Sequence, residues 1–193
     1  MIGSVADRRQ AKVATIVAAA WGLARMNGIG AVSLRALARE VGMRQPSLYE
    51  YFDSKHALYD AMFADGNRQL LERLEALPPD QDPRRALKSF MRTLADFALE
   101  DDARHALLFQ RPIPGYEPGP EAYPDAERVL GRAVELMAAA GVDDPGDVDC
   151  IVAVVGGLID AQTSNDPGGD RWVRHLDRLI DLHLDDANRR SRR

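Results

Sequence analysis

The stretch Ser33–Lys55, SLRALAREVGMRQPSLYEYFDSK, decides the fold of the first part of this chain. Ser33 is a good N-cap, because its hydroxyl can accept a hydrogen bond from a free backbone N–H group of the first helical turn. Apolar residues then recur at i, i+3, i+4 and i+7, at Leu34, Leu37, Ala38 and Val41. This spacing predicts the apolar face of a single two-turn helix.

A second short helix follows Gly42, a residue that can end a helix in the left-handed conformation without steric cost. Pro46 suits the first turn of the next helix, where its missing N–H is not needed. That helix is expected to bury Leu48 and Phe52 and to leave outside a polar set: Arg44, Gln45, Ser47, Tyr49 and Tyr51. Together the two helices predict a helix-turn-helix, whose second helix enters the major groove of DNA.

The longer run Gly28–Met62, GIGAVSLRALAREVGMRQPSLYEYFDSKHALYDAM, resembles the DNA-binding domain of the TetR family of bacterial repressors. It includes the ordered pattern Gly-x5-Leu-Tyr-x-Tyr-Phe-x-Ser-Lys, and with the preceding helix it covers about the first third of the chain. An ordered string of this kind is far more specific than the helical spacing alone.

The resemblance implies a role for each matching side chain. It implies that Gln45, Pro46 and Tyr49 face base edges, that Arg35 contacts bases or backbone, and that Ser47, Tyr51 and Lys55 hold phosphates. Arg44 is also well placed, at the start of the second helix. The chemistry agrees, because glutamine can pair with adenine and arginine with guanine, while hydroxyls and lysine fix register on phosphates. The alternative is that these are ordinary solvated residues.

The charge of the chain is divided unevenly. Residues 1–56 carry eight Lys/Arg against four Asp/Glu, whereas residues 57–193 carry 17 against 26, within a total of −5. An acidic protein can still bind DNA, because the charge of the contacting face decides the interaction. The first part is therefore positive enough for phosphate contacts, and the remainder would repel DNA.

The sequence favours a cytoplasmic protein. The single cysteine, Cys150, excludes an internal disulfide and fits a reducing compartment. No signal peptide is expected at the start, where Arg8, Arg9 and Lys12 precede an ordinary amphipathic helix. The longest uncharged apolar run, Cys150–Ile159, is too short for a membrane span, which needs about 20 residues.

The rest of the chain predicts further helices and no strands. We expect helices from after Asp7 to Asn27 and then over 55–77, 83–99, 102–110, 124–140, 146–164 and 170–187, by apolar spacing, caps and breakers. The proline-rich segment 111–124, RPIPGYEPGPEAYP, is expected to be a surface loop at a pocket mouth. The predicted fold is all-α with about nine helices: a DNA-binding domain over 1–54 and an effector-binding and dimerisation domain over 55–193.

The resemblance further implies a two-fold dimer that reads near-palindromic operator DNA. The helix 146–164 and the last helix are the candidates for a four-helix interface, because both carry broad apolar stripes and Gly156-Gly157 permits close approach. The predicted interface residues are Ile151, Val155, Leu158, Trp172, Leu176 and Ile180. The alternative is that both helices simply pack into the core of one subunit.

A small apolar or amphipathic effector is the other partner that the resemblance implies, with effector binding releasing DNA. Such a pocket needs apolar walls and a few placed polar groups. The candidates are Phe90, Leu94, Phe97, Leu108, Phe109, Tyr116, Tyr123, Met137 and Gln162. Each of them also fits an ordinary place in a core.

An enzyme is poorly supported, and no cofactor or metal is expected. No Ser/His/Asp arrangement or glycine-rich phosphate loop occurs in a motif context. Asp177, Asp181 and Asp185 lie at i, i+4 and i+8, which fits a solvated stripe better than a cation site. The resemblance to the TetR family implies a repressor instead, with a helical interaction module that has lost sequence-specific DNA binding as the alternative.

Overall fold

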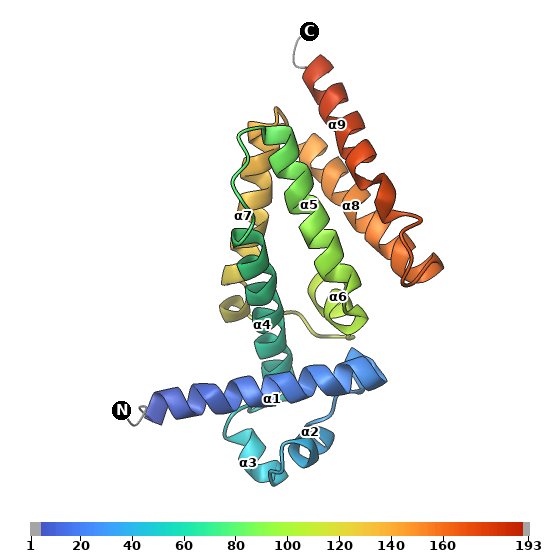
Figure 1. Ribbon diagram of the computed structural model, residues 1–193. Coiled ribbons are helices and arrows are strands. Elements are labelled where there is room, and N and C mark those ends of the chain that lie inside the picture. Colours follow the sequence, from blue (N-terminus) through green and yellow to red (C-terminus); the bar gives the residue numbers. More distant parts are fainter. Residues whose placement is uncertain (1–4, 191–193) are drawn as a thin grey trace. The chain divides into compact units, whose positions relative to one another are not determined.

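The computed structural model describes residues 5–190, and over that range the chain is helical without strands (Figure 1). Nine α-helices lie in it: α1 Val5–Asn27, α2 Leu34–Glu40, α3 Gln45–Tyr49, α4 Lys55–Glu75, α5 Pro83–Leu99, α6 Asp102–Phe109, α7 Pro124–Ala139, α8 Pro145–Asn165 and α9 Leu176–Arg190. Short 3₁₀ helices span Ile29–Ala31, Pro120–Ala122 and Val173–His175. The all-α prediction is confirmed.

Local sequence signals set most helix boundaries. Asp82 caps α5 by accepting from the backbone N–H groups of Arg84 and Arg85, and a proline occupies its first turn. Asp144 caps α8 in the same way. No helix among the described residues is both long enough and apolar enough to cross a membrane.

The start of the last helix was predicted wrongly. Helix α9 begins at Leu176 rather than near residue 170, because a turn and a 3₁₀ helix occupy the intervening residues. This turn is held by the buried amide of Gln162, whose oxygen accepts from the backbone N–H of Trp172 at 2.9 Å. Asp166 also accepts from the N–H of Arg171. These tertiary hydrogen bonds have no signature in helical periodicity.

The chain packs as two compact units. Unit 1 comprises the described residues through Asn67 together with Ala103–Pro124, and unit 2 comprises Arg68–Asp102 together with the described residues from Asp125. Helix α4 contributes to both, and the proline-rich segment belongs to unit 1. The predicted boundary between a DNA-binding domain over 1–54 and an effector-binding and dimerisation domain over 55–193 stays a prediction.

The core of unit 1 joins all three N-terminal helices to the first half of α4. Ile16 of α1, Leu37 of α2 and Leu48 of α3 are completely buried. Leu58 and Met62 of α4 are also completely buried, as expected for a helix that supports a small domain. Burying each such side chain contributes about 1.5–3 kcal/mol. The three N-terminal helices alone would form a small core, so the buried side chains of α4 add stability that this domain needs.

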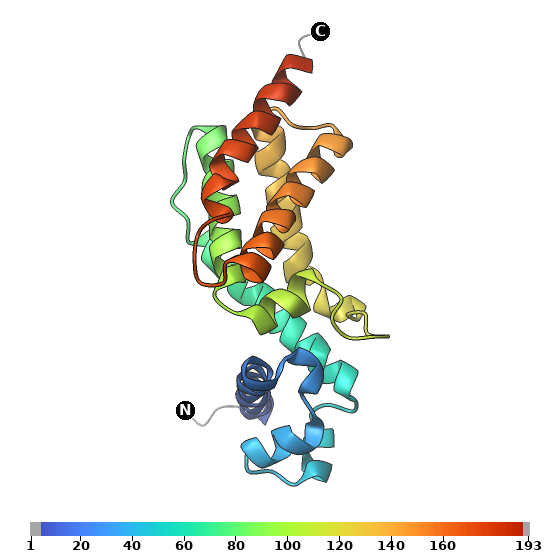
Figure 2. The ribbon, with the colours of Figure 1, turned by 90° about the vertical axis from the view of Figure 1, so that its right-hand side faces the viewer.

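In unit 2, helices α5, α8 and α9 lie side by side (Figures 1 and 2). Completely or almost completely buried side chains fill the space between them, among them Leu87, Ile151, Leu176 and Ile180. This three-helix packing uses the apolar stripes of α8 and α9 within one chain.

Charged side chains also join α5 to α9. Arg84, Lys88 and Arg92 are spaced by four residues on α5, and they pair with Asp177, Asp181 and Asp185, spaced by four on α9. The three acids therefore form half-exposed ion pairs with the neighbouring helix. No group of three or more potential metal ligands occurs in residues 5–190.

Candidate DNA-binding surface

The turn between α2 and α3 is built as its sequence predicts. The Ser33 hydroxyl accepts from the backbone N–H of Ala36 at 3.1 Å and caps α2. Gly42 then takes a φ of 65°, in the left-handed region that favours glycine. Pro46 lies in the first turn of α3, whose N-cap residue is Arg44. The reversal therefore places α3 directly after α2, as in a helix-turn-helix.

The outward side of α3 carries most of the side chains predicted to read DNA. Arg44, Gln45 and Pro46 are exposed, and Tyr49 keeps 46% of its surface exposed. Ser47 is only partly exposed. Exposure leaves these groups available to a ligand without disturbing the core.

The core positions predicted for this segment agree with the structure. Leu48 and Phe52 are buried beneath α3. Arg35, at the start of α2, is exposed.

Arg9 is a residue of this surface that the sequence reasoning missed. Its guanidinium donates from Nη2 to the backbone oxygen of Glu50 at 3.2 Å and lies 5.6 Å from the ring centre of Tyr51. Arg9 thus ties α1 to the end of α3 and brings a further positive charge beside it. The sequence offered one indication, the basic pair Arg8-Arg9. Nothing local pointed to its contacts with Glu50 and Tyr51, because these residues are about 40 positions away.

Lys55 has a structural contact in addition to its predicted role at phosphate. Its Nζ donates to the backbone oxygen of Gly30 at 3.0 Å and lies 5.2 Å from the ring centre of Tyr59. The Tyr59 hydroxyl donates to the neighbouring oxygen of Ile29 at 3.1 Å. Helix α4 therefore fixes the segment that precedes α2. A phosphate would have to share the ammonium group with Gly30.

The proline-rich segment lies against α4 within unit 1. Asp60 Oδ1 accepts from the Tyr116 hydroxyl and from the Gly119 backbone N–H, each at 3.0 Å. Burial, reinforced by the bond to Asp60, raises the pKa of Tyr116, so its hydroxyl stays protonated and remains a donor. Tyr123 packs edge-on against Phe63. These three polar and aromatic contacts therefore hold a segment that has almost no regular structure.

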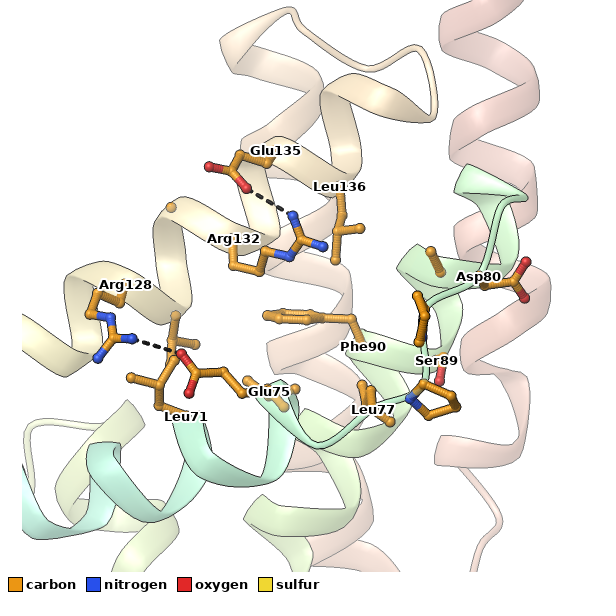
Figure 3. Close-up of a pocket in the computed structure, with 16 residues that line it drawn as sticks. Leu71, Glu75, Leu77, Asp80, Ser89, Phe90, Arg128, Arg132, Glu135 and Leu136 are labelled. Atoms are coloured by element: carbon orange, nitrogen blue, oxygen red, sulfur yellow. Dashed lines mark hydrogen bonds and ion pairs between the residues drawn. The ribbon is translucent and has the colours of Figure 1, made fainter.

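The predicted effector residues separate into several places. Leu108, Phe109, Tyr116 and Tyr123 line a cavity of about 290 Å³ in unit 1, beneath the proline-rich segment. Phe90 lines a different cavity of about 730 Å³ in unit 2 (Figure 3). Leu94, Phe97 and Met137 line neither of these two, and Phe97 and Met137 are buried.

Gln162 lines a third cavity, of about 460 Å³, and also has a structural role. Its side-chain oxygen accepts from the backbone N–H groups of Trp172 and Val173, and its amide nitrogen donates to Asp166. Both ends of the amide are thus engaged within the chain.

The predicted dimer residues need correction as contact residues. Ile151, Val155, Leu158, Leu176 and Ile180 are each at most 8% exposed within the single chain, and Trp172 is partly exposed. A side chain covered by its own chain offers little surface to a second copy. The exposed apolar residues on these helices are instead Val152 and Leu182, which are 47% and 53% exposed.

Comparison with known proteins gives a consistent family. The model of bacterial regulatory proteins of the tetR family matches residues 16–62, which contain α2 and α3. The HTH-type transcriptional regulator Rv1816 of Mycobacterium tuberculosis is 29% identical over 117 residues, covering 58% of this chain and 50% of that protein. The chain thus spans about half the length of the curated relatives it matches.

Solved structures resemble this chain along nearly its whole length. The putative regulatory protein SCO4313 superposes with a TM-score of 0.72 at 23% identity, covering 96% of this chain and 98% of the other. RolR in complex with resorcinol gives a TM-score of 0.62 at 19% identity, covering 95% and 96%. At these identities the likeness concerns the fold.

Proposed function

We propose that this chain is a TetR-type repressor, because residues 16–62 match the model of that family and a curated HTH-type transcriptional regulator is 29% identical over 117 residues. It would bind near-palindromic operator DNA as a dimer and leave it when a small effector binds. The match over residues 16–62, which contain α2 and α3, supports a DNA-binding helix-turn-helix. Repression, the form of the operator and release by an effector are our proposal.

The exposed face of α3 is the observation that carries this proposal. Gln45 and Tyr49 offer hydrogen-bonding groups beside the exposed guanidinium of Arg44, above a buried core that holds the helix in place. Direct readout of bases needs such groups on a helix that fits the major groove. The surrounding residues 1–56 carry a net positive charge, which suits the phosphate backbone.

Selection of bound fragments from a random pool of double-stranded DNA tests this function. We expect enrichment of a sequence with two inverted half-sites, because two copies of one reader related by a two-fold axis bind such a site. Enrichment of single half-sites would contradict the dimer. Failure to enrich any sequence would instead favour the interaction module.

We propose that the dimer forms through the exposed side of α8 and α9. Val152 and Leu182 supply apolar surface there, and Gly156 and Gly157 have open space where a Cβ would lie. Bare backbone of this kind permits close approach of another helix. Buried neighbours such as Leu158 support the interface from within the subunit.

Exposed valines on two helices allow a matched test of this interface. We expect Val152→Glu to give monomers by light scattering, because the charge would be desolvated between the subunits. Val134→Glu, at a 41% exposed position on α7, should remain dimeric. A Val152→Glu protein that stays dimeric would exclude this face. Charges at Leu158 or Leu176 would disrupt the core and are poor probes.

The effector part of the proposal is supported by cavities in both units. RolR, whose fold this chain shares, has been solved with resorcinol, a small molecule. The cavity of about 730 Å³ in unit 2 has a volume typical of small-molecule sites, which run from about 300 to 1,000 Å³. Its walls indicate what kind of molecule it would accept.

A further inference from the structure

The larger cavity lies in unit 2 between the end of α4, the start of α5 and the middle of α7 (Figure 3). Its inner wall is apolar. Leu71 and Leu74 of α4, Phe90 of α5 and Val129 of α7 line it, and each is less than 10% exposed. Such a wall suits a hydrocarbon or aromatic body, because removing apolar surface from water is favourable.

The outer rim of this cavity carries two arginines. Arg128 pairs with Glu75 at 2.7 Å, and Arg132 pairs with Glu135 at 2.9 Å. All four side chains are more than half exposed. Exposed pairs of this kind contribute little stability, so a ligand can replace a partner at small cost.

The two members of the second pair face different ways. Figure 3 shows the guanidinium of Arg132 on the side of the cavity where Phe90 and Leu136 lie, with Glu135 on its outer side. Asp80, a third acid of the lining, is held by two hydrogen bonds from Arg85 at 2.9 Å. The charged group turned toward the apolar wall is therefore a cation with N–H donors.

We propose that this cavity binds an amphipathic monocarboxylic acid. Its apolar body would lie along Leu71 and Phe90, and its carboxylate would pair with Arg132 in place of Glu135. Arginine suits this role because its planar donors match a carboxylate in a bidentate way. The inference deepens the effector part of the proposed function, on which its biological meaning rests, but binding itself is measured without DNA.

Three probes with the same ten-carbon chain separate head-group chemistry from tail burial. Isothermal titration of the full chain with decanoate, decanol and decylamine, below their micelle concentrations, should rank decanoate first. We expect decanoate to bind about tenfold tighter than decanol, as one charge-assisted hydrogen bond provides. Equal or tighter binding of decylamine, or no binding of decanoate, would overturn the proposal.

Substitutions on α7 assign the site. Arg132→Gln should lose about tenfold in decanoate affinity and leave decanol unchanged, whereas Arg68→Gln, at an arginine outside this cavity, should alter neither. Gly131 lines the cavity and has open space at its Cβ position, so Gly131→Leu should weaken both probes without disturbing the core. Decanoate affinity unchanged in Arg132→Gln would overturn the assignment.

A second experiment measures whether decanoate binding changes the affinity of the chain for DNA. The same decanoate is titrated into the chain bound to its selected DNA, followed by fluorescence anisotropy. Binding of decanoate with no change in DNA affinity would uphold the cavity assignment and remove effector release from the proposed function. Release of DNA by decanoate that persists in Arg132→Gln would uphold effector release and overturn this cavity as its site.

Discussion

The ammonium group of Lys88 donates to Asp181 Oδ2 at 2.6 Å and thereby joins α5 to α9. Arg84 donates to the other oxygen of the same carboxylate at 3.0 Å. One acid on α9 thus serves two bases on α5. This arrangement explains why acids spaced by four residues occur on one helix and bases with the same spacing on the other.

Removing this shared acid should lower the stability of the chain. We expect Asp181→Asn to reduce the free energy of unfolding in urea by about 1 kcal/mol, because two partly buried bases lose one partner. Asp186→Asn is the matched control, since Asp186 pairs with the exposed Arg189 and Arg190 of its own helix. Equal effects of the two substitutions would show that the link between helices adds nothing.

The stability of the chain should fall on acidification. A hydrogen bond from Arg84 holds the pKa of Asp185 below its ordinary 3.8, and Arg85 acts likewise on Asp80. A carboxylate with a depressed folded pKa contributes stability above its unfolded pKa and loses it as the pH falls through the folded value. The free energy of unfolding in urea should therefore decrease below about pH 4. Asp185→Asn should show a smaller decrease between pH 5 and pH 3 than the wild type.

The turn of the helix-turn-helix should depend on Gly42. A Cβ there meets no atom within 4 Å, so Gly42→Ala is strained only by its φ of 65°. We expect a loss of about 1 kcal/mol in the free energy of unfolding. Gly30→Ala has equally open space and no positive φ, and it should be nearly neutral. A neutral Gly42→Ala would mean that the turn adopts another conformation.

Tyr49→Ala should abolish operator binding while leaving the fold intact. The ring is 46% exposed on α3, so its loss leaves little cavity, whereas a base contact would disappear. The measurement is a gel shift on the selected DNA together with circular dichroism. Glu50→Ala, at the next exposed position, should bind as well as wild type or better, because it removes a negative charge. If Tyr49→Ala keeps both its affinity for the selected DNA and its circular dichroism spectrum, Tyr49 does not contact the bases.

Lys55→Ala should weaken binding to all DNA sequences alike. We expect the slope of log affinity against log salt to decrease by about one, as for one lost phosphate contact. The melting temperature should also fall, because the bond to Gly30 disappears. Arg189→Ala removes one positive charge from the end of α9 and should leave the salt slope unchanged. An unchanged slope for Lys55→Ala would leave this residue with its structural role alone.

Local signals in the sequence predict the helices and the helix-turn-helix. Caps, breakers and apolar spacing are local, so Ser33, Gly42, Pro46 and Asp82 predict helix ends that the structure contains. The buried positions Leu48 and Phe52 followed from the same period. The family pattern around Tyr49 is readable in the sequence because its residues are contiguous, and the TetR family model matches residues 16–62.

Which surfaces these helices share depends on how they pack in three dimensions. Periodicity shows that Ile151 and Leu176 face something apolar, but burial within one chain or against a second copy gives the same pattern. Several hydrogen bonds join residues that are separated in the sequence: Arg9 to Glu50, Tyr116 to Asp60, and Trp172 to Gln162. Such hydrogen bonds depend on how helices pack, and packing is a property of the whole chain rather than of any local stretch.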